Sequence, residues 1–200
     1  MKIVILEAAH NKNGMTLALV NSFIDGVKSA DSKAEIKQHD LLNENIEFCR
    51  GCNQCVLSKV DNPKCVINDV CEDIKKGALE ADVVVLATPI YEYAVSSSMK
   101  RFLERCLSLA TFKFGPAPRF KSVPGKVGVV ICSSGAPFPF NHLMGITRYP
   151  KRILKLACRM FRCSKIEMIF AGGMAVNEKM KNKWLERARS DGYKIAKVKK

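Results

Sequence analysis

The feature that most constrains this chain is a continuous apolar run at residues 83–87, which Pro89 closes two residues later. An uninterrupted apolar run of this length is typical of a strand that is buried on both faces. A serine cluster follows at residues 96–98, and its hydroxyls suit the N-cap of a helix. We therefore predict a buried strand, a short loop that holds Pro89, Tyr91 and Tyr93, and then a helix.

The same alternation extends along the whole chain. We expect strands at residues 2–7, 34–39, 82–87, 126–132 and 165–170, and helices at residues 15–29, 69–80, 97–109, 149–162 and 178–198. Strands that alternate with helices are typical of a parallel sheet covered on both faces. Right-handed crossovers and a length of 200 residues then favour an α/β, flavodoxin-like three-layer sandwich, with five parallel strands in the order 2-1-3-4-5.

We expect one domain over residues 1–200, because the chain has no internal repeat, low-complexity tract or linker. Loops are predicted at residues 111–124 and 133–148. The N-terminal apolar run is short and ends at Glu7, and no apolar stretch has the length of a membrane span. We therefore expect neither a signal peptide nor an integral membrane segment, and a cytoplasmic location.

Five of the nine cysteines lie in an excursion at residues 41–71, which is longer than an ordinary strand–helix connection. Two tandem C-x-x-C steps place three thiols on one tight loop, which suits three corners of an iron–sulfur cubane. Zinc could use the same thiols, and structural or redox thiols are the third interpretation. The predicted metal ligands are Cys49, Cys52, Cys55 and Cys65, with Cys71 as a substitute.

The other cysteines stand singly in apolar or helical settings, where we expect them to be small buried hydrophobic residues. They are Cys106, Cys132, Cys158 and Cys163.

Three loops follow the carboxyl ends of predicted strands, which is where ligands bind in open α/β sheets. Residues 8–16 run from a buried strand into a helix N-terminus, whose free N–H groups and dipole attract phosphate. Gly14 permits close backbone approach, and Thr16 adds a hydroxyl. Residues 88–94 and 133–135 offer aromatic rings, small side chains and backbone groups to a flat aromatic ligand. Each loop taken alone is also compatible with an ordinary strand–helix turn.

Together these segments resemble the NAD(P)H-dependent FMN reductase family of the flavodoxin-like superfamily, and in particular its cysteine-bearing branch, the iron-sulfur flavoproteins. The resemblance rests on residues 88–100, on Lys12-Asn13-Gly14 with Thr16, and on the cysteine segment that ends in residues 65–69. It implies FMN as cofactor, NAD(P)H as electron donor, a 4Fe-4S cluster on the cysteine loop, and a homodimer or homotetramer.

The resemblance also implies which residues bind FMN. They are His10, Asn11, Asn13, Gly14, Met15, Thr16, Thr88, Pro89, Ile90, Tyr91, Glu92, Tyr93, Ala94, Ser133, Ser134 and Gly135. The chain departs from the family where Ser-Pro-Arg is usual, because it has Ala9-His10-Asn11, and Met15 replaces an asparagine. A phosphate-facing hydroxyl and a cation are therefore missing. Backbone donors, Thr16, His10 or Lys12 would have to hold the phosphate instead.

The net charge of +14 is concentrated at the C-terminal end, where residues 148–200 hold 16 Lys/Arg and 4 Asp/Glu. Within the predicted helix, one face carries Arg148, Arg152, Lys155, Arg159 and Arg162. Such a stripe is usually a solvated face, but this one lacks acidic residues and would attract a small acidic redox protein, nucleic acid or an anionic membrane. We do not expect nucleic acid, because no recognised binding motif is present.

The sequence thus predicts an FMN-binding oxidoreductase that takes electrons from a nicotinamide nucleotide or a small acidic redox protein. If the cysteine loop holds an iron–sulfur cluster, that cluster would relay single electrons to or from the flavin. No catalytic acid or base is nominated, since the flavin itself performs the chemistry. The alternative is a non-catalytic protein that binds zinc or docks a partner and has a degenerate flavin site.

Overall fold

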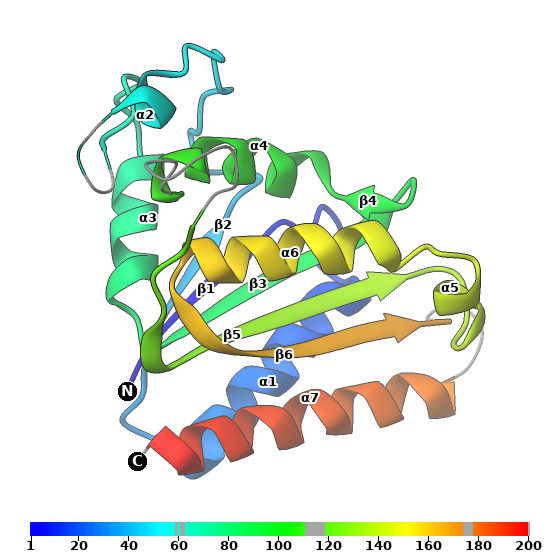
Figure 1. The fold of residues 1–200 in the computed structure, drawn as a ribbon. Helices are drawn as coiled ribbons and strands as arrows, with labels where there is room; N and C mark the ends of the chain where they lie inside the picture. Colours follow the sequence, from blue (N-terminus) through cyan, green and yellow to red (C-terminus); the bar gives the residue numbers. More distant parts are fainter. Residues whose placement is uncertain (59, 61–62, 111–118, 174–177, 200) are drawn as a thin grey trace.

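A computed structural model describes the chain except at residues 59, 61–62, 111–118, 174–177 and 200. Within this described part, six strands form one sheet (Figure 1). The strands are β1 (Lys2–Glu7), β2 (Glu35–Asp40), β3 (Val83–Tyr91), β4 (Ala94–Val95), β5 (Val123–Ser134) and β6 (Cys163–Gly172). The helices are α1 (Met15–Ala30), α2 (Gln54–Leu57), α3 (Cys71–Glu80), α4 (Ser97–Arg105), the 3-10 helix η1 (Cys106–Leu109), α5 (Phe140–Leu143), α6 (Arg148–Met160) and α7 (Glu178–Lys199).

The main sheet is parallel and has the order β2-β1-β3-β5-β6, which confirms the predicted 2-1-3-4-5 arrangement. The apolar run predicted to be a central strand is β3, and its residues are buried from Val83 to Ile90. Its neighbours supply equally apolar partners, for example Ile5 of β1 and Val129 of β5, both opposite Val85. Burial on both faces explains why this strand does not alternate in polarity.

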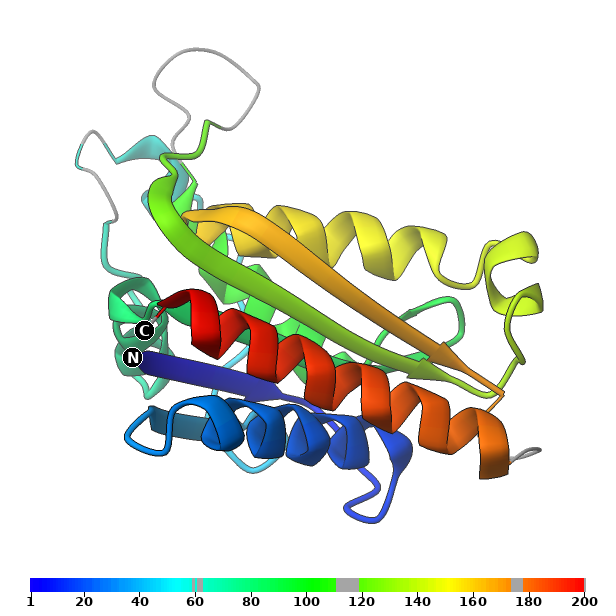
Figure 2. The same cartoon turned by 90° about the horizontal axis from the view of Figure 1, so that it is seen from below.

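Helices cover both faces of the sheet: α1 and α7 lie on one side, and α3, α4 and α6 on the other (Figures 1 and 2). Helices α1 and α7 pack very closely against each other. A Cβ atom on Gly26 would lie 1.9 Å from the Arg189 carbonyl oxygen, and one on Gly192 would lie 2.2 Å from the Phe23 carbonyl oxygen. On the other side, Phe102 of α4 stacks on Phe161 with ring centroids 6.2 Å apart.

One prediction about the central strand was wrong. Pro89 and Tyr91 belong to β3 itself, because the chain turns sharply at Glu92 and Tyr93 and returns as β4. Both turn residues have positive φ, 45° and 60°, and the two strands of the hairpin pair Tyr91 with Ala94. The predicted cap of the next helix is confirmed, since the Ser96 hydroxyl accepts a hydrogen bond from the Met99 N–H at 3.5 Å.

Other boundaries also differ from the prediction. The expected helix at residues 97–109 changes into η1 after Arg105, and the predicted loop at 133–148 contains α5. The predicted loop at 111–124 ends inside β5, while its residues 111–118 lie outside the described part of the chain. Because α6 ends at Met160, Arg162 is not on the helix face but in the turn beyond it, with φ of 66°. Within the residues that the structure describes, no helix is both long and apolar enough to cross a bilayer.

Candidate functional site

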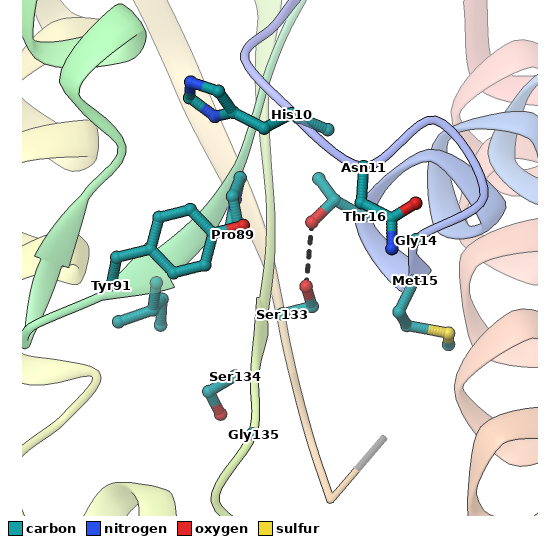
Figure 3. A pocket seen from close by; sticks show the side chains of 12 residues that line it. His10, Asn11, Gly14, Met15, Thr16, Pro89, Tyr91, Ser133, Ser134 and Gly135 are labelled. Atoms are coloured by element: carbon teal, nitrogen blue, oxygen red, sulfur yellow. Dashed lines mark hydrogen bonds between the residues drawn. The ribbon is translucent and has the colours of Figure 1, made fainter. Parts of the chain in front are cut away.

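A cavity of about 210 Å³ lies at the carboxyl ends of β1, β3 and β5 (Figure 3). This is the edge of the sheet where the three predicted loops were expected to meet. The cavity is lined by Ala9, His10, Asn11, Gly14, Met15, Thr16, Pro89, Ile90, Tyr91, Ser133, Ser134 and Gly135.

The first wall is the loop between β1 and α1. The Ala8 N–H donates to the Ala87 carbonyl at 2.9 Å, which fixes the loop to β3, and the Gly14 N–H donates to the Asn11 carbonyl at 3.0 Å. Gly14 is the N-cap of α1, but no side chain accepts from the first turn and that turn holds no acidic residue. Within the described chain, the N–H groups at the start of α1 are therefore open to an anion.

Lys12 does not face this anion site. Its ammonium group forms an ion pair with the carboxylates of Glu7, at 3.2 Å, and Asp40. Partial burial lowers the pKa of Lys12, but the hydrogen bonds to Asp40 and Glu7 outweigh this effect and raise the pKa above its usual value. Lys12 therefore does not line the cavity, and His10 is the one lining residue described that can carry a positive charge.

The first and third loops meet at a hydrogen bond. The hydroxyl oxygens of Thr16 and Ser133 lie 2.8 Å apart, and both side chains are buried (Figure 3). Next to them, Ser134 and Gly135 continue the wall from the end of β5. A Cβ atom on Gly135 would meet no heavy atom within 4 Å, so open space lies beside this backbone.

The remaining wall is aromatic. Tyr91 is about half exposed, at 51%, and its ring centroid lies 6.4 Å from that of His10. Figure 3 shows the Tyr91 ring and the Ser133–Gly135 backbone on different sides of the cavity. The cavity thus offers an aromatic ring and backbone groups, which are the contacts that a flat aromatic ligand makes in proteins.

Five residues of the predicted flavin site do not line the cavity. The hydroxyl of Thr88 is buried and hydrogen-bonded to Ser96, whose own hydroxyl donates to the Ala8 carbonyl at 3.0 Å. Thr88 therefore helps to connect the ends of β1 and β3 through buried hydrogen bonds, and it does not line the cavity. The others are Asn13, Glu92, Tyr93 and Ala94. The prediction also missed Ala9, which lines the cavity, because a small apolar side chain gives no sequence signal of ligand binding.

The cysteine segment protrudes from the end of the molecule that carries α2 (Figure 1). Cys49 and Cys52 are exposed, and Cys55 and Cys65 are half-buried. Burial raises the pKa of Cys55, and the thiolates of Cys65, Cys49 and Cys52 raise it further. The other three predicted ligands therefore lie within electrostatic range of Cys55. Among the described residues, however, no group of three or more His, Cys, Asp or Glu side chains is arranged to hold a metal ion.

Cys71 does not suit the role of a substitute ligand. It begins α3, is 0% exposed and packs in the hydrophobic core. Burial raises its pKa to about 12, whereas a metal ligand must be a thiolate. The expectation that Cys106, Cys132, Cys158 and Cys163 are buried is confirmed.

The family model of the flavodoxin-like fold matches residues 1–194, and the chain belongs to this family. The chain is 26% identical over 155 residues to an iron-sulfur flavoprotein of Archaeoglobus fulgidus, covering 78% of this chain and 63% of that protein. It is 27% identical to an FMN-dependent NADH:quinone oxidoreductase of Delftia acidovorans, covering 64% and 61%. The matches thus span less than two thirds of these relatives' lengths. A protein of the latter name from Alcanivorax borkumensis is 22% identical over 94% of this chain and 96% of its own.

Solved structures support the fold over the full length. An NAD(P)H:quinone oxidoreductase from Methanothermobacter marburgensis superimposes with a TM-score of 0.76 at 18% identity, covering 96% of this chain and 98% of the other. An FMN-dependent NADH-azoreductase from Bacillus anthracis, in complex with FMN, gives 0.75 at 14% identity, covering 98% and 100%. At these identities the likeness concerns the fold alone.

Proposed function

We propose that this protein is an FMN-dependent oxidoreductase that takes electrons from NAD(P)H. The observation that carries the proposal is the cavity at the sheet edge, which joins an uncapped helix N-terminus to an aromatic wall. Phosphate and a flat ring are the two ends of FMN, and each finds its chemical complement there. The names of relatives, which include FMN and NADH, support the same assignment.

The residues present would hold FMN mainly through the backbone. The N–H groups at the start of α1 would bind the phosphate, with His10 as a cation when it is protonated. The ring would lie between Tyr91 and the Ser134–Gly135 backbone. When bound, FMN supplies hydride acceptance and electron transfer, and the protein positions and tunes its ring. No side chain of the cavity needs to act as an acid or base.

Two classes of electron partner fit this proposal. A nicotinamide nucleotide would reach the flavin at the open sheet edge. A small acidic redox protein is supported by five exposed cations on α6, none of which forms an ion pair within the described chain. They are Arg148, Lys151, Arg152, Lys155 and Arg159, and we call them the α6 stripe.

The cysteine segment adds a second part to the proposal, a metal centre held by Cys49, Cys52, Cys55 and Cys65. The support is the electrostatic influence of the other three thiols on Cys55 and the name iron-sulfur flavoprotein carried by relatives. A 4Fe-4S cluster is the predicted group, and zinc is the alternative. Among the described residues, these thiols do not have the geometry of a metal-ligand set. Assembly into a homodimer or homotetramer and a cytoplasmic location stay predictions.

Titration of the purified protein with FMN, followed by flavin fluorescence, tests the proposal directly. We expect saturable one-to-one binding, and NAD(P)H oxidation that requires FMN. Failure to bind FMN would reject the proposal and favour the alternative, a metal-binding or docking protein with a degenerate flavin site. FMN binding without NAD(P)H oxidation would retain the cofactor but reject the donor.

A further inference from the structure

The middle of β5 contains a glycine, Gly128, although glycine weakens a strand interior. The reason lies in the packing. A Cβ atom on Gly128 would lie 2.8 Å from the Sγ atom of Cys158 and 3.2 Å from that of Cys163. Two sulfur atoms therefore occupy the space that a side chain at this position would need, and they lie close to each other.

The two cysteines come from adjacent elements. Cys158 is in the last turn of α6, and Cys163 is the first residue of β6. The chain between them turns at Arg162, whose φ is 66°. Both cysteines are buried, at 0% and 4% exposure, and both sulfur atoms lie against the same backbone position, Gly128. A disulfide requires two cysteines whose side chains lie close together, and the shared position against Gly128 provides this proximity.

The surroundings distinguish the two thiols. Interaction with the Cys158 thiol lowers the pKa of Cys163. Burial raises this pKa, and the ammonium groups of Lys126 and Lys199 lower it. Lys126 is held beside the pair by hydrogen bonds of 2.7 Å to the carbonyls of Ala78 and Leu79. Interaction with the Cys163 thiol, together with burial, raises the pKa of Cys158. Cys163 is therefore the thiol that more readily forms a thiolate.

Access also favours Cys163. A surface cavity of about 330 Å³ leads to it, and Cys158 does not line that cavity. The lining residues are Phe120, Lys121, Ser122, Arg159, Cys163 and Ser164. The site lies at the amino end of β6, whereas the proposed flavin cavity lies at the carboxyl ends of the strands (Figure 1). The two sites are therefore separate.

We propose that Cys163 is a hydroperoxide-reactive thiol and that Cys158 resolves its oxidised form into an intramolecular disulfide. The Cys163 thiolate attacks one peroxide oxygen, the O–O bond breaks, and the departing hydroxide takes up a proton to become water. The Cys163 sulfenic acid is then attacked by the Cys158 sulfur. An S–S bond forms, the S–O bond breaks, and a second water leaves with the Cys158 proton. Two thiols are oxidised to one disulfide while one hydrogen peroxide is reduced to two waters.

The experiment is to treat the folded full-length protein with hydrogen peroxide, block the remaining thiols, and digest it with trypsin. Cleavage after Arg159 and Arg162 separates Cys158, in peptide 156–159, from Cys163, in peptide 163–165. We expect a linked pair of these peptides that is lost on reduction. The linkage should form at least about tenfold faster than oxidation of Cys132, a buried thiol whose pKa burial raises.

Matched variants assign the roles. Cys158→Ser should leave Cys163 as a sulfenic acid that dimedone traps, whereas Cys163→Ser should abolish both products, and Cys132→Ser should change neither. Circular dichroism confirms that each variant is folded. The proposal fails if folded wild-type protein gives no linked peptide, or if Cys163 and Cys132 are oxidised at the same rate.

Discussion

Arg105 holds Asp69 with both ends of its guanidinium group: Nη1 lies 2.6 Å from Oδ2, and Nη2 lies 3.1 Å from Oδ1. The same guanidinium donates to the carbonyls of Glu47, at 2.9 Å, and Ile67, at 3.1 Å. One buried side chain of α4 therefore fixes both ends of the protruding cysteine segment. The segment is thus anchored at its base, although its thiols lie near the surface.

This ion pair predicts an acid-sensitive contribution to stability. Burial favours the neutral acid, but hydrogen bonds led by that from Arg105 lower the pKa of Asp69. Its contribution is therefore fully present above about pH 3.9, the ordinary value of an aspartate, and is lost as the pH falls through the lowered pKa. Arg105→Met leaves a buried carboxylate unpaired and should cost about 3–5 kcal/mol of unfolding free energy at pH 7.

Urea unfolding between pH 2 and pH 7 measures this effect. The control is Lys100→Met, which removes an exposed ion pair with Glu104 and should cost less than about 1 kcal/mol. The stability difference between Arg105→Met and wild type should shrink at acid pH. A difference that stays constant across the range would contradict the assignment to Asp69.

The flavin cavity makes a prediction that separates two nearby positions. Gly135→Val adds a side chain where a Cβ meets nothing within 4 Å, so the fold should tolerate it while the ring space is filled. We expect FMN affinity to fall at least about tenfold, the loss of one good contact. Lys12→Met breaks the pairs with Glu7 and Asp40 but removes nothing from the cavity, so the Kd for FMN should stay nearly unchanged.

Fluorescence titration of both variants gives the two dissociation constants, with thermal unfolding as the check on folding. A large loss of affinity in Lys12→Met would show that Lys12 leaves its carboxylate partners to bind the ligand. Unchanged affinity in Gly135→Val would mean that the ring does not lie at the end of β5.

The metal prediction concerns the cysteine segment. Single Cys→Ser changes at 49, 52, 55 and 65 should each remove bound metal from anaerobically prepared protein, whereas Cys132→Ser should retain it. Iron, sulfide and zinc analysis distinguishes the predicted cluster from zinc. A wild-type protein that holds neither after reconstitution would refute the metal centre and leave the flavin site untouched.

Several features were predictable from the sequence because their causes are local. An apolar run such as Val83–Ala87 is buried wherever the strand lies in a parallel sheet, and a serine directly before a helix caps that helix. The hairpin at Glu92 and Tyr93 was not predictable, since two consecutive non-glycine residues with positive φ are rare. The ion pair between Lys12 and Asp40 was not predictable either, because it depends on the register that brings the end of β2 beside the end of β1.

The cysteines illustrate the same limit. The spacing of the cysteines at residues 49–65 was enough to predict a site there. Cys158 and Cys163, in contrast, were predicted as isolated hydrophobic residues. Their contact depends on how α6 packs on the sheet and on the absence of a side chain at Gly128. Neither fact is encoded in a local pattern.

The α6 stripe should govern association with an acidic redox protein rather than flavin chemistry. Replacing Lys151, Arg152 and Lys155 by Glu changes the local charge by six units on an exposed face and leaves the buried residues of α6 in place. Arg159 is kept, because it lines the cavity at Cys163. Steering acts on the association rate and is screened over a Debye length of about 8 Å at physiological ionic strength.

Stopped-flow reduction of an acidic electron-transfer protein, measured at several salt concentrations, tests this. The triple variant should react at least about tenfold more slowly at low salt and should lose most of its salt dependence, while reduction of a small neutral quinone stays unchanged. A matched reversal of Lys183, Lys194 and Lys197 on α7 makes the same change in net charge away from α6 and should have a much smaller effect. If both triple variants slow the reaction equally, net charge rather than the α6 stripe governs docking.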